Sequence, residues 1–218
     1  MGQAIRRVLL LAIAGVVVHA PGARAQDAGS EDQPRAVYTA HLSALNTTVT
    51  GRAATAEVRL TIRGDSLTIS VDASGLPPDI THWQHLHGFP DGRRSSCPTR
   101  AADANGDGII DLIETEPMAG TTMVPLHGDP VSLDVARDTY PRASATGTVH
   151  YQQTVSLHAL QEASGRAFAG QTLDLDRRVV FIHGVSTATP LPPSVASLGS
   201  IPARVTLPIA CGLITRLK

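Results

Sequence analysis

Strict alternation of apolar and polar residues over positions 54–71 constrains the fold of this chain more than any other feature. From Ala54 to Ile62 every second residue is apolar, and the residues between them are threonine, glutamate or arginine. This period of two is typical of a β-strand with one buried face. Gly64-Asp65 is a turn signal, and the alternation resumes from Leu67 to Val71. The segment therefore predicts a β-hairpin.

Further segments have the same strand-like composition. We expect strands at 37–45, 80–89, 146–157, 178–183 and 203–209. Pro77-Pro78 ends the second strand of the hairpin, because proline has no N–H to donate to a ladder. The stretch 187–200 is rich in proline, serine and glycine and is expected to be a loop. Many short strands separated by turn residues favour a closed antiparallel β-sandwich or barrel.

The N-terminus has the composition of a secretory signal peptide. Arg6 and Arg7 precede an apolar run from Val8 to Val18, and Ala23-Arg24-Ala25 has the small-x-small form of a cleavage site. The run is too short for a membrane helix, which needs about 20 apolar residues. We therefore predict a signal peptide at 1–25, a flexible segment at 26–36, and a secreted or periplasmic domain at 37–218 without a membrane span.

The charge balance excludes one class of partner. The predicted signal peptide contains three of the 18 basic residues and none of the 19 acidic residues, so the rest of the chain is mildly acidic. A mild negative charge without a basic patch does not fit nucleic-acid binding. The remaining length suits one domain with a real core, and nothing in it indicates an oligomeric state.

Two cysteines, Cys97 and Cys211, are present in the predicted exported domain. Thiols are oxidised outside the cytoplasm, so we favour a disulfide between them. Free thiols and metal ligands are the alternatives.

The segment 103–114 matches the calcium-loop pattern at every position. Oxygen-bearing side chains occupy places one, three, five, nine and twelve of the twelve-residue loop, and a glycine occupies place six. A calcium ion needs six or more oxygens, and this spacing wraps them around one point. A proline directly after Cys97 argues against a preceding helix, so we expect a single structural calcium site rather than half of an EF-hand pair; the alternative is a solvated acidic loop. The expected ligands are Asp103, Asn105, Asp107, the Ile109 carbonyl, Asp111 and Glu114.

A second constellation is a group of histidines around position 85. His85 and His87 point to the same face of a strand, about 6.5–7 Å apart, close enough to share one metal ion. His183 ends a late apolar strand and could supply a third ligand. Imidazole clusters suit copper and zinc, but a His-x-His pair alone is equally compatible with two ordinary strand histidines.

Around these residues the sequence resembles the Cu/Zn superoxide dismutases. That family places a structural histidine three residues before the first of two copper ligands, as His82 precedes His85. It has a disulfide cysteine shortly after the second ligand, a later copper ligand after an apolar strand, and a final Ala-Cys-Gly strand like 210–214. The early part, from Tyr38 onward, also resembles bacterial CHRD-type domains. The resemblance implies a Greek-key antiparallel β-sandwich with the calcium-type loop inserted, the Cys97–Cys211 disulfide, His82 as a structural neighbour, and copper held by His85, His87 and His183.

The sequence also departs from that family. No histidine lies between Cys97 and His127, so the histidine that bridges copper and zinc is missing and zinc is not expected. His127 and Asp129 do not have the spacing of the family's zinc ligands and are expected in a surface loop. Pro208 stands where the family has an arginine that guides the anion. The other single histidines, His41, His150 and His158, are expected at the surface or the edge of the core.

Two hypotheses follow. The first is an exported copper enzyme that dismutates a small anion, superoxide, at the three-histidine site. The second is a non-catalytic CHRD-like β domain that binds metal, or uses the histidines structurally or for interaction. Three histidine ligands favour the first, and the missing bridging histidine and arginine favour the second.

Overall fold

A computed structural model describes residues 33–218. The predicted signal peptide at 1–25 lies outside the described residues, as does most of the segment 26–36. No helix in the described part of the chain is long and apolar enough to cross a membrane.

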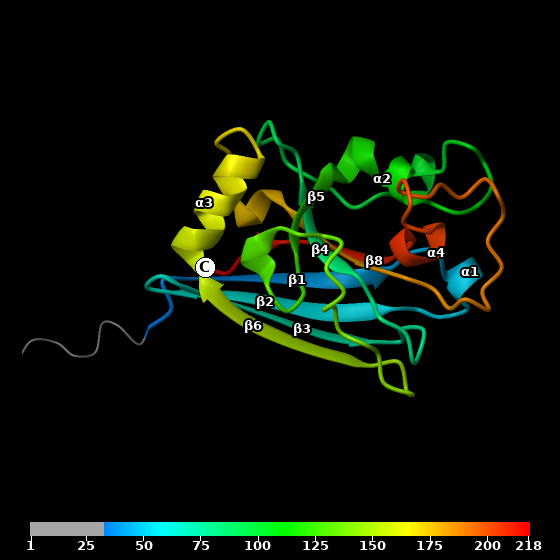
Figure 1. Cartoon of the computed structure of the whole chain (residues 1–218), viewed down its shortest axis with the longest axis horizontal. Coiled ribbons are helices and arrows are strands. Elements are labelled where there is room, and N and C mark those ends of the chain that lie inside the picture. The colour runs from blue at the N-terminus through cyan, green and yellow to red at the C-terminus, as the bar shows by residue number, and fades with distance from the viewer. Residues whose placement is uncertain (1–32) are drawn as a thin grey trace, which may run out of the picture.

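Nine antiparallel strands form one strongly curled sheet (Figure 1). Eight of them are joined in the order β5-β4-β7-β8-β1-β2-β3-β6, and β9 pairs with β1. The strands are β1 (Ala36–Ala44), β2 (Thr55–Arg63), β3 (Ser66–Ser74), β4 (Gln84–Gly88), β5 (Thr121–Pro125), β6 (Val149–Ser156), β7 (Val179–His183), β8 (Pro208–Leu213) and β9 (Thr215–Arg216).

The strand order divides the sheet into two halves. β1, β2, β3 and β6 form one half, and β4, β5, β7 and β8 form the other. The end of β1 joins them, because Ser43 and Ala44 pair with Cys211 and Ala210 of β8. After the β1-β2-β3 meander the chain crosses to the second half at β4 and returns at β6, a Greek-key connection. The predicted all-β antiparallel fold is confirmed.

The alternating hairpin supplies much of the core. Leu60 of β2 and Ile69 of β3 face each other in the ladder and are fully buried. Their side chains belong to the same apolar cluster as Leu86 of β4 and Val180 of β7, from the other half of the sheet. Burial of a side chain of this size stabilises the fold by about 1.5–3 kcal/mol. The two halves are thus held around one common core.

Short helices occupy the connections. The α-helices are α1 (Thr47–Thr50), α2 (Leu112–Ala119), α3 (Leu157–Ala167) and α4 (Ala203–Thr206), and the 3-10 helices are η1 (Arg100–Ala102), η2 (Pro130–Ser132) and η3 (Leu175–Arg177). The single 3-10 turn η1 directly precedes the calcium-type loop. The expectation that no helix precedes this loop is therefore wrong, although η1 is only one turn long. The proline at position 98 does not prevent this turn, because it lies before η1 and outside it.

Several predicted strand limits are wrong. The segment expected at 203–209 begins as helix α4, and the strand starts only at Pro208. The strand expected at 80–89 covers Gln84–Gly88, so His82 lies before it. The segment between 90 and 145, where no strand is expected from the sequence, contains α2 and the strand β5.

Helix α3 replaces the end of another predicted strand. Ser156 ends β6 and caps α3, since its hydroxyl accepts a hydrogen bond from Ala159 N at 3.1 Å. Leu157, Leu160 and Ser164 are the buried residues of this helix, at helical spacing. The change from period two to the helical period thus falls at Ser156.

The predicted disulfide is confirmed. Cys97 and Cys211 are bonded, with Cα atoms 5.8 Å apart. The bond attaches the segment before the calcium-type loop to strand β8. In the chain-entropy model a loop of about 100 residues gives a stabilisation of about 4.7 kcal/mol.

Candidate metal centre

Three histidines from two neighbouring strands converge in the interior. His85 and His87 lie on β4 and His183 ends β7. One nitrogen from each ring lies within 4.8 Å of the other two, and all three side chains are buried. Among the described residues no other group of histidine, cysteine or acidic side chains was found at this spacing. The three residues predicted from the sequence are therefore brought together.

Irregularities in the strands aim the rings at one point. The β4–β5 register shifts between Leu86 and His87, and the β7–β8 register shifts between Ile182 and His183. The ring centroids of His85 and His183 are 5.2 Å apart, and those of His87 and His183 are 5.6 Å apart. The same-face placement of His85 and His87 holds, with ring centroids 5.8 Å apart.

In two of the three rings one nitrogen has a protein partner and the other has none. Nδ1 of His183 lies 2.8 Å from the Thr206 carbonyl, and Nε2 of His85 lies 2.8 Å from the Tyr140 hydroxyl. The buried atoms His85 Nδ1 and His183 Nε2 have no hydrogen-bond partner. Buried polar atoms normally have a hydrogen-bond partner, so two buried nitrogens without one in the same cluster need an explanation. A metal ion bound to both nitrogens supplies one.

His87 completes the set. Its Nδ1 donates a long hydrogen bond, 3.4 Å, to the Gly120 carbonyl, and its Nε2 lies 3.2 Å from the Thr122 hydroxyl. Gly120 has φ 75°, and a Cβ there would lie 2.2 Å from the Gly88 carbonyl oxygen. Only glycine therefore allows β5 to begin this close to β4. The Nε2 lone pair is available to a metal in place of the hydroxyl hydrogen.

Burial keeps the three rings uncharged. It disfavours the charged imidazolium and lowers the pKa of His87 to about 3 and that of His183 to about 4, with repulsion from His183 as a smaller cause for His87 and repulsion from His82 as a smaller cause for His183. The pKa of His85 is lowered well below its ordinary value by burial first, and then by repulsion from His183, His87 and His127. Neutral imidazole is the form that binds metal. At neutral pH all three residues are therefore in the ligand form.

His82 lies beside the cluster without joining it. Its Nδ1 lies 2.9 Å from the His183 carbonyl and its Nε2 lies 2.8 Å from the Pro77 carbonyl. The ring thus lies between two backbone carbonyls, and burial lowers its pKa, so the neutral ring has one N–H and donates to one of these carbonyls. The structural role of His82 stays a prediction.

A layer of aromatic rings supports His85 from the side away from the cluster. Tyr140 stacks on Trp83 with ring centroids 5.1 Å apart, and it packs in a T-shaped arrangement with His127, with ring centroids 4.9 Å apart. No sequence pattern singles out Tyr140, because its place depends on the path of an irregular segment. Burial raises the pKa of Tyr140 far above its ordinary value, so its hydroxyl stays protonated.

The expectation that His127 lies in a surface loop is wrong. Its side chain is fully buried, with Nε2 2.9 Å from the Asp134 carbonyl and Nδ1 accepting from Asp129 N at 3.0 Å. Both ring nitrogens bond to the backbone, which leaves His127 a structural residue. His41, His150 and His158 are exposed, as expected.

A small pocket adjoins the cluster. Its volume is about 10 Å³, roughly the least that one water molecule requires. No charged side chain lines it within the described structure. The lining consists of Trp83, His85, Leu112, Thr122, Val135, His183, Leu198 and Thr206.

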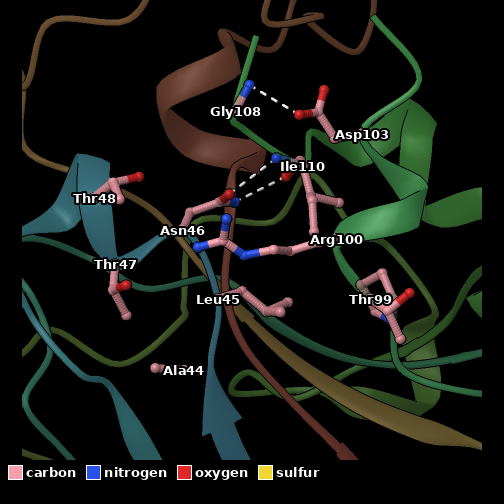
Figure 2. Close-up of a pocket in the computed structure, with 11 residues that line it drawn as sticks. Ala44, Leu45, Asn46, Thr47, Thr48, Thr99, Arg100, Asp103, Gly108 and Ile110 are labelled. Carbon is pink, nitrogen blue, oxygen red and sulfur yellow. Dashed lines mark hydrogen bonds between the residues drawn. The ribbon is translucent and has the colours of Figure 1, made fainter. Parts of the chain in front are cut away.

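The calcium-type loop is ordered by its own side chains. The Asp103 carboxylate accepts from Gly108 N at 2.9 Å, and Asn46 binds both the N–H and the carbonyl of Ile110 (Figure 2). The Ile109 N–H donates to Asp107. The carboxylates of Asp103 and Asp107, two of the predicted calcium ligands, thus accept hydrogen bonds from backbone amides. The carboxylate oxygens of the loop do not lie as close to one another as the three histidine nitrogens do.

The last two predicted calcium ligands also form a helix cap. Asp111 accepts from Glu114 N at 3.1 Å, and Glu114 accepts from Asp111 N at 3.0 Å. This reciprocal pair is a capping box at the start of α2. Places nine and twelve of the loop pattern therefore have a structural role that needs no metal. The calcium site remains a prediction.

No protein-family model matches the sequence, and no curated protein matches it. Solved structures do match, among them a Cu/Zn superoxide dismutase from Brucella abortus. That likeness has a TM-score of 0.43 and 20% sequence identity, and it covers 82% of this chain and 99% of the dismutase. A likeness of this degree carries no information about chemistry, so the function must follow from the residues themselves.

Proposed function

We propose that this protein binds one copper ion through Nδ1 of His85 and Nε2 of His87 and His183. The observation that carries the proposal is that one nitrogen from each of these three buried rings lies within 4.8 Å of the other two, and that His85 Nδ1 and His183 Nε2 have no hydrogen-bond partner. Three neutral imidazoles suit copper and zinc, and copper is bound more tightly than zinc by a given site of this kind. When bound, copper would supply a one-electron redox couple.

The surroundings of the site support retention of the metal. The second nitrogen of each ring has a protein partner, which orients the ring and fixes its tautomer. Leu198 and Val135 are among the residues that line the adjoining pocket, which leaves room for about one water molecule. A buried site with three fixed ligands favours a protein that holds its metal tightly.

Dismutation of superoxide is the second candidate function. It is supported by the ordered matches of His82, His85, Cys97 and the final Ala-Cys-Gly strand to the dismutase pattern. The pocket has a size that suits only a very small molecule. Against it stand the lack of a charged lining residue and Pro208 at the place of the guiding arginine, because an anion then has no local attraction to the metal. The non-catalytic alternative is therefore retained beside it.

We also propose that the loop 103–114 binds calcium as a structural ion. The complete side-chain pattern and the turns already formed around Asp103 and Asp107 support this proposal. Export to an oxidising compartment, secreted or periplasmic, is supported by the Cys97–Cys211 disulfide and by the N-terminal sequence.

Metal analysis of the purified protein tests the first proposal. We expect one copper per chain in the wild type and none in His85→Ala. His150→Ala is the matched control, because this histidine is exposed and lies far from the cluster in sequence and on a different strand. Equal copper content in both variants would refute the site.

A superoxide assay on the copper-loaded wild type then separates the two functions: turnover supports the enzyme, and bound copper without turnover supports the non-catalytic protein.

A further inference from the structure

The hydrogen bond between His85 and Tyr140 has a direction that can be assigned. The Tyr140 hydroxyl lies 2.8 Å from His85 Nε2 and 3.0 Å from the Val135 carbonyl oxygen. A carbonyl can only accept, and a hydroxyl has one hydrogen. The hydroxyl therefore donates to Val135, and it must accept from an N–H at Nε2 of His85.

This direction decides which nitrogen of His85 is free. A neutral imidazole carries one hydrogen, so an N–H at Nε2 leaves the lone pair on Nδ1. Nδ1 is the buried atom without a partner. The position of the Tyr140 hydroxyl therefore selects the tautomer of His85 that can serve as a ligand in the cluster.

Tyr140 is itself held firmly. The residue is 6% exposed, and its ring contacts the rings of Trp83 and His127. His127 is fixed in turn by backbone bonds to Asp129 and Asp134. A hydroxyl placed by three packed rings has little freedom to move away from His85.

We propose that Tyr140 is the positioning residue of the metal centre and acts through His85 by fixing its tautomer and ring orientation. The proposal rests on the metal-binding function above and adds a specific role to a residue outside the ligand set. Loss of such a partner of a ligand weakens metal binding by roughly 10–100-fold.

Tyr140→Phe removes only the hydroxyl and keeps the stack on Trp83. Tyr151→Phe is the matched control, because Tyr151 is a buried tyrosine whose hydroxyl also donates to a carbonyl, that of His127, at 3.0 Å. Copper affinity is measured by chelator competition, and the electron paramagnetic resonance spectrum of the copper-loaded protein reports the ligand field. We expect about a 10–100-fold weaker affinity and a changed spectrum for Tyr140→Phe alone. Equal affinities in both variants would overturn the role of Tyr140.

A second measurement needs neither metal nor variant. Nitrogen–hydrogen correlation spectra of the histidine rings in the metal-free wild type should show the His85 proton on Nε2. A proton on Nδ1 would overturn the positioning role even if copper binds. A wild type that shows this tautomer but binds no copper would overturn the metal site itself, so the two failures are distinguishable.

Discussion

Asp111 accepts a hydrogen bond from the backbone N–H of Ala196 at 2.7 Å, although the two residues are 85 positions apart in the chain. The other oxygen of this buried carboxylate caps helix α2. Leu112, the first residue of that helix, and Leu198, two residues after Ala196, both line the pocket beside His85 and His183. One carboxylate thus anchors two segments that cover the candidate copper site.

Replacement of Asp111 should loosen this cover. Asp111→Ala removes the cap and the Ala196 bond, and we expect the free energy of unfolding to fall by about 1–2 kcal/mol. Copper should also leave the protein faster in a chelator chase. Measurements in calcium chelator exclude any effect of a lost calcium ligand. Asp176→Ala, at an exposed site with only a distant ion pair, is the control; equal copper release from both variants would contradict the shared anchor.

Calcium should stabilise the folded protein through the loop 103–114. An ion that binds only the folded state raises stability by about 2.7 kcal/mol at a concentration one hundred times its dissociation constant. We expect a higher melting temperature in calcium than in chelator. Asp103→Ala should abolish the difference, because it removes the first ligand and the Gly108 contact. Asp91→Asn, an exposed acidic residue outside the loop, should preserve it. Identical wild-type melting curves in calcium and in chelator would contradict calcium binding by this loop.

The disulfide should contribute strongly to stability. A double variant with Cys97→Ser and Cys211→Ser frees a loop of 114 residues in the unfolded chain, and the chain-entropy model gives a loss of about 4–5 kcal/mol. Urea unfolding of the variant and of the oxidised wild type measures the difference. Reduction of the wild type should lower its midpoint to that of the variant. A variant as stable as the oxidised protein would show that folded contacts alone hold Cys97 against β8.

The three converging histidines could be predicted from the sequence, whereas the residues that support them could not. His85, His87 and His183 lie on or at the end of apolar strands, where a period of two fixes which side chains share a face. Tyr140 reaches His85 from an irregular segment whose path follows no periodicity. The carbonyls of Gly120 and Thr206 are backbone groups, and the sequence gives no sign of where they point.

Other differences from the sequence-based prediction have local signals. Asp111 and Glu114 have the spacing of a capping box, which predicts a helix at this point, but the same residues also satisfy the calcium pattern. Ser156 is a typical N-cap residue, and Leu157 and Leu160 after it have helical spacing. Helices α2 and α3 were therefore predictable. Helix α4 was not, because the β-branched pair Val205-Thr206 favours a strand and only the tertiary fold overrides that preference.

The buried histidines should make the metal-free protein sensitive to acid. In the folded state the pKa of His183 is about 4 and that of His87 is about 3, against an ordinary value of 6.5. Between these values the unfolded chain binds more protons than the folded one, so stability falls as the pH falls. The stabilisation is complete above pH 6.5 and is lost progressively toward pH 4, with a slope of up to about 1.4 kcal/mol per pH unit for each buried histidine.

Urea unfolding of the metal-free wild type in chelator, between pH 7 and pH 5, measures this loss in a range where few carboxylates titrate. We expect His183→Asn to have a smaller slope than the wild type, since one proton-binding group is removed from the unfolded chain. His150→Ala, which removes an exposed histidine, should keep the full slope. Loading with copper should extend stability to lower pH, because the bound rings resist protonation. A wild-type stability that stays constant over this range would show that the three rings are not buried in their neutral form.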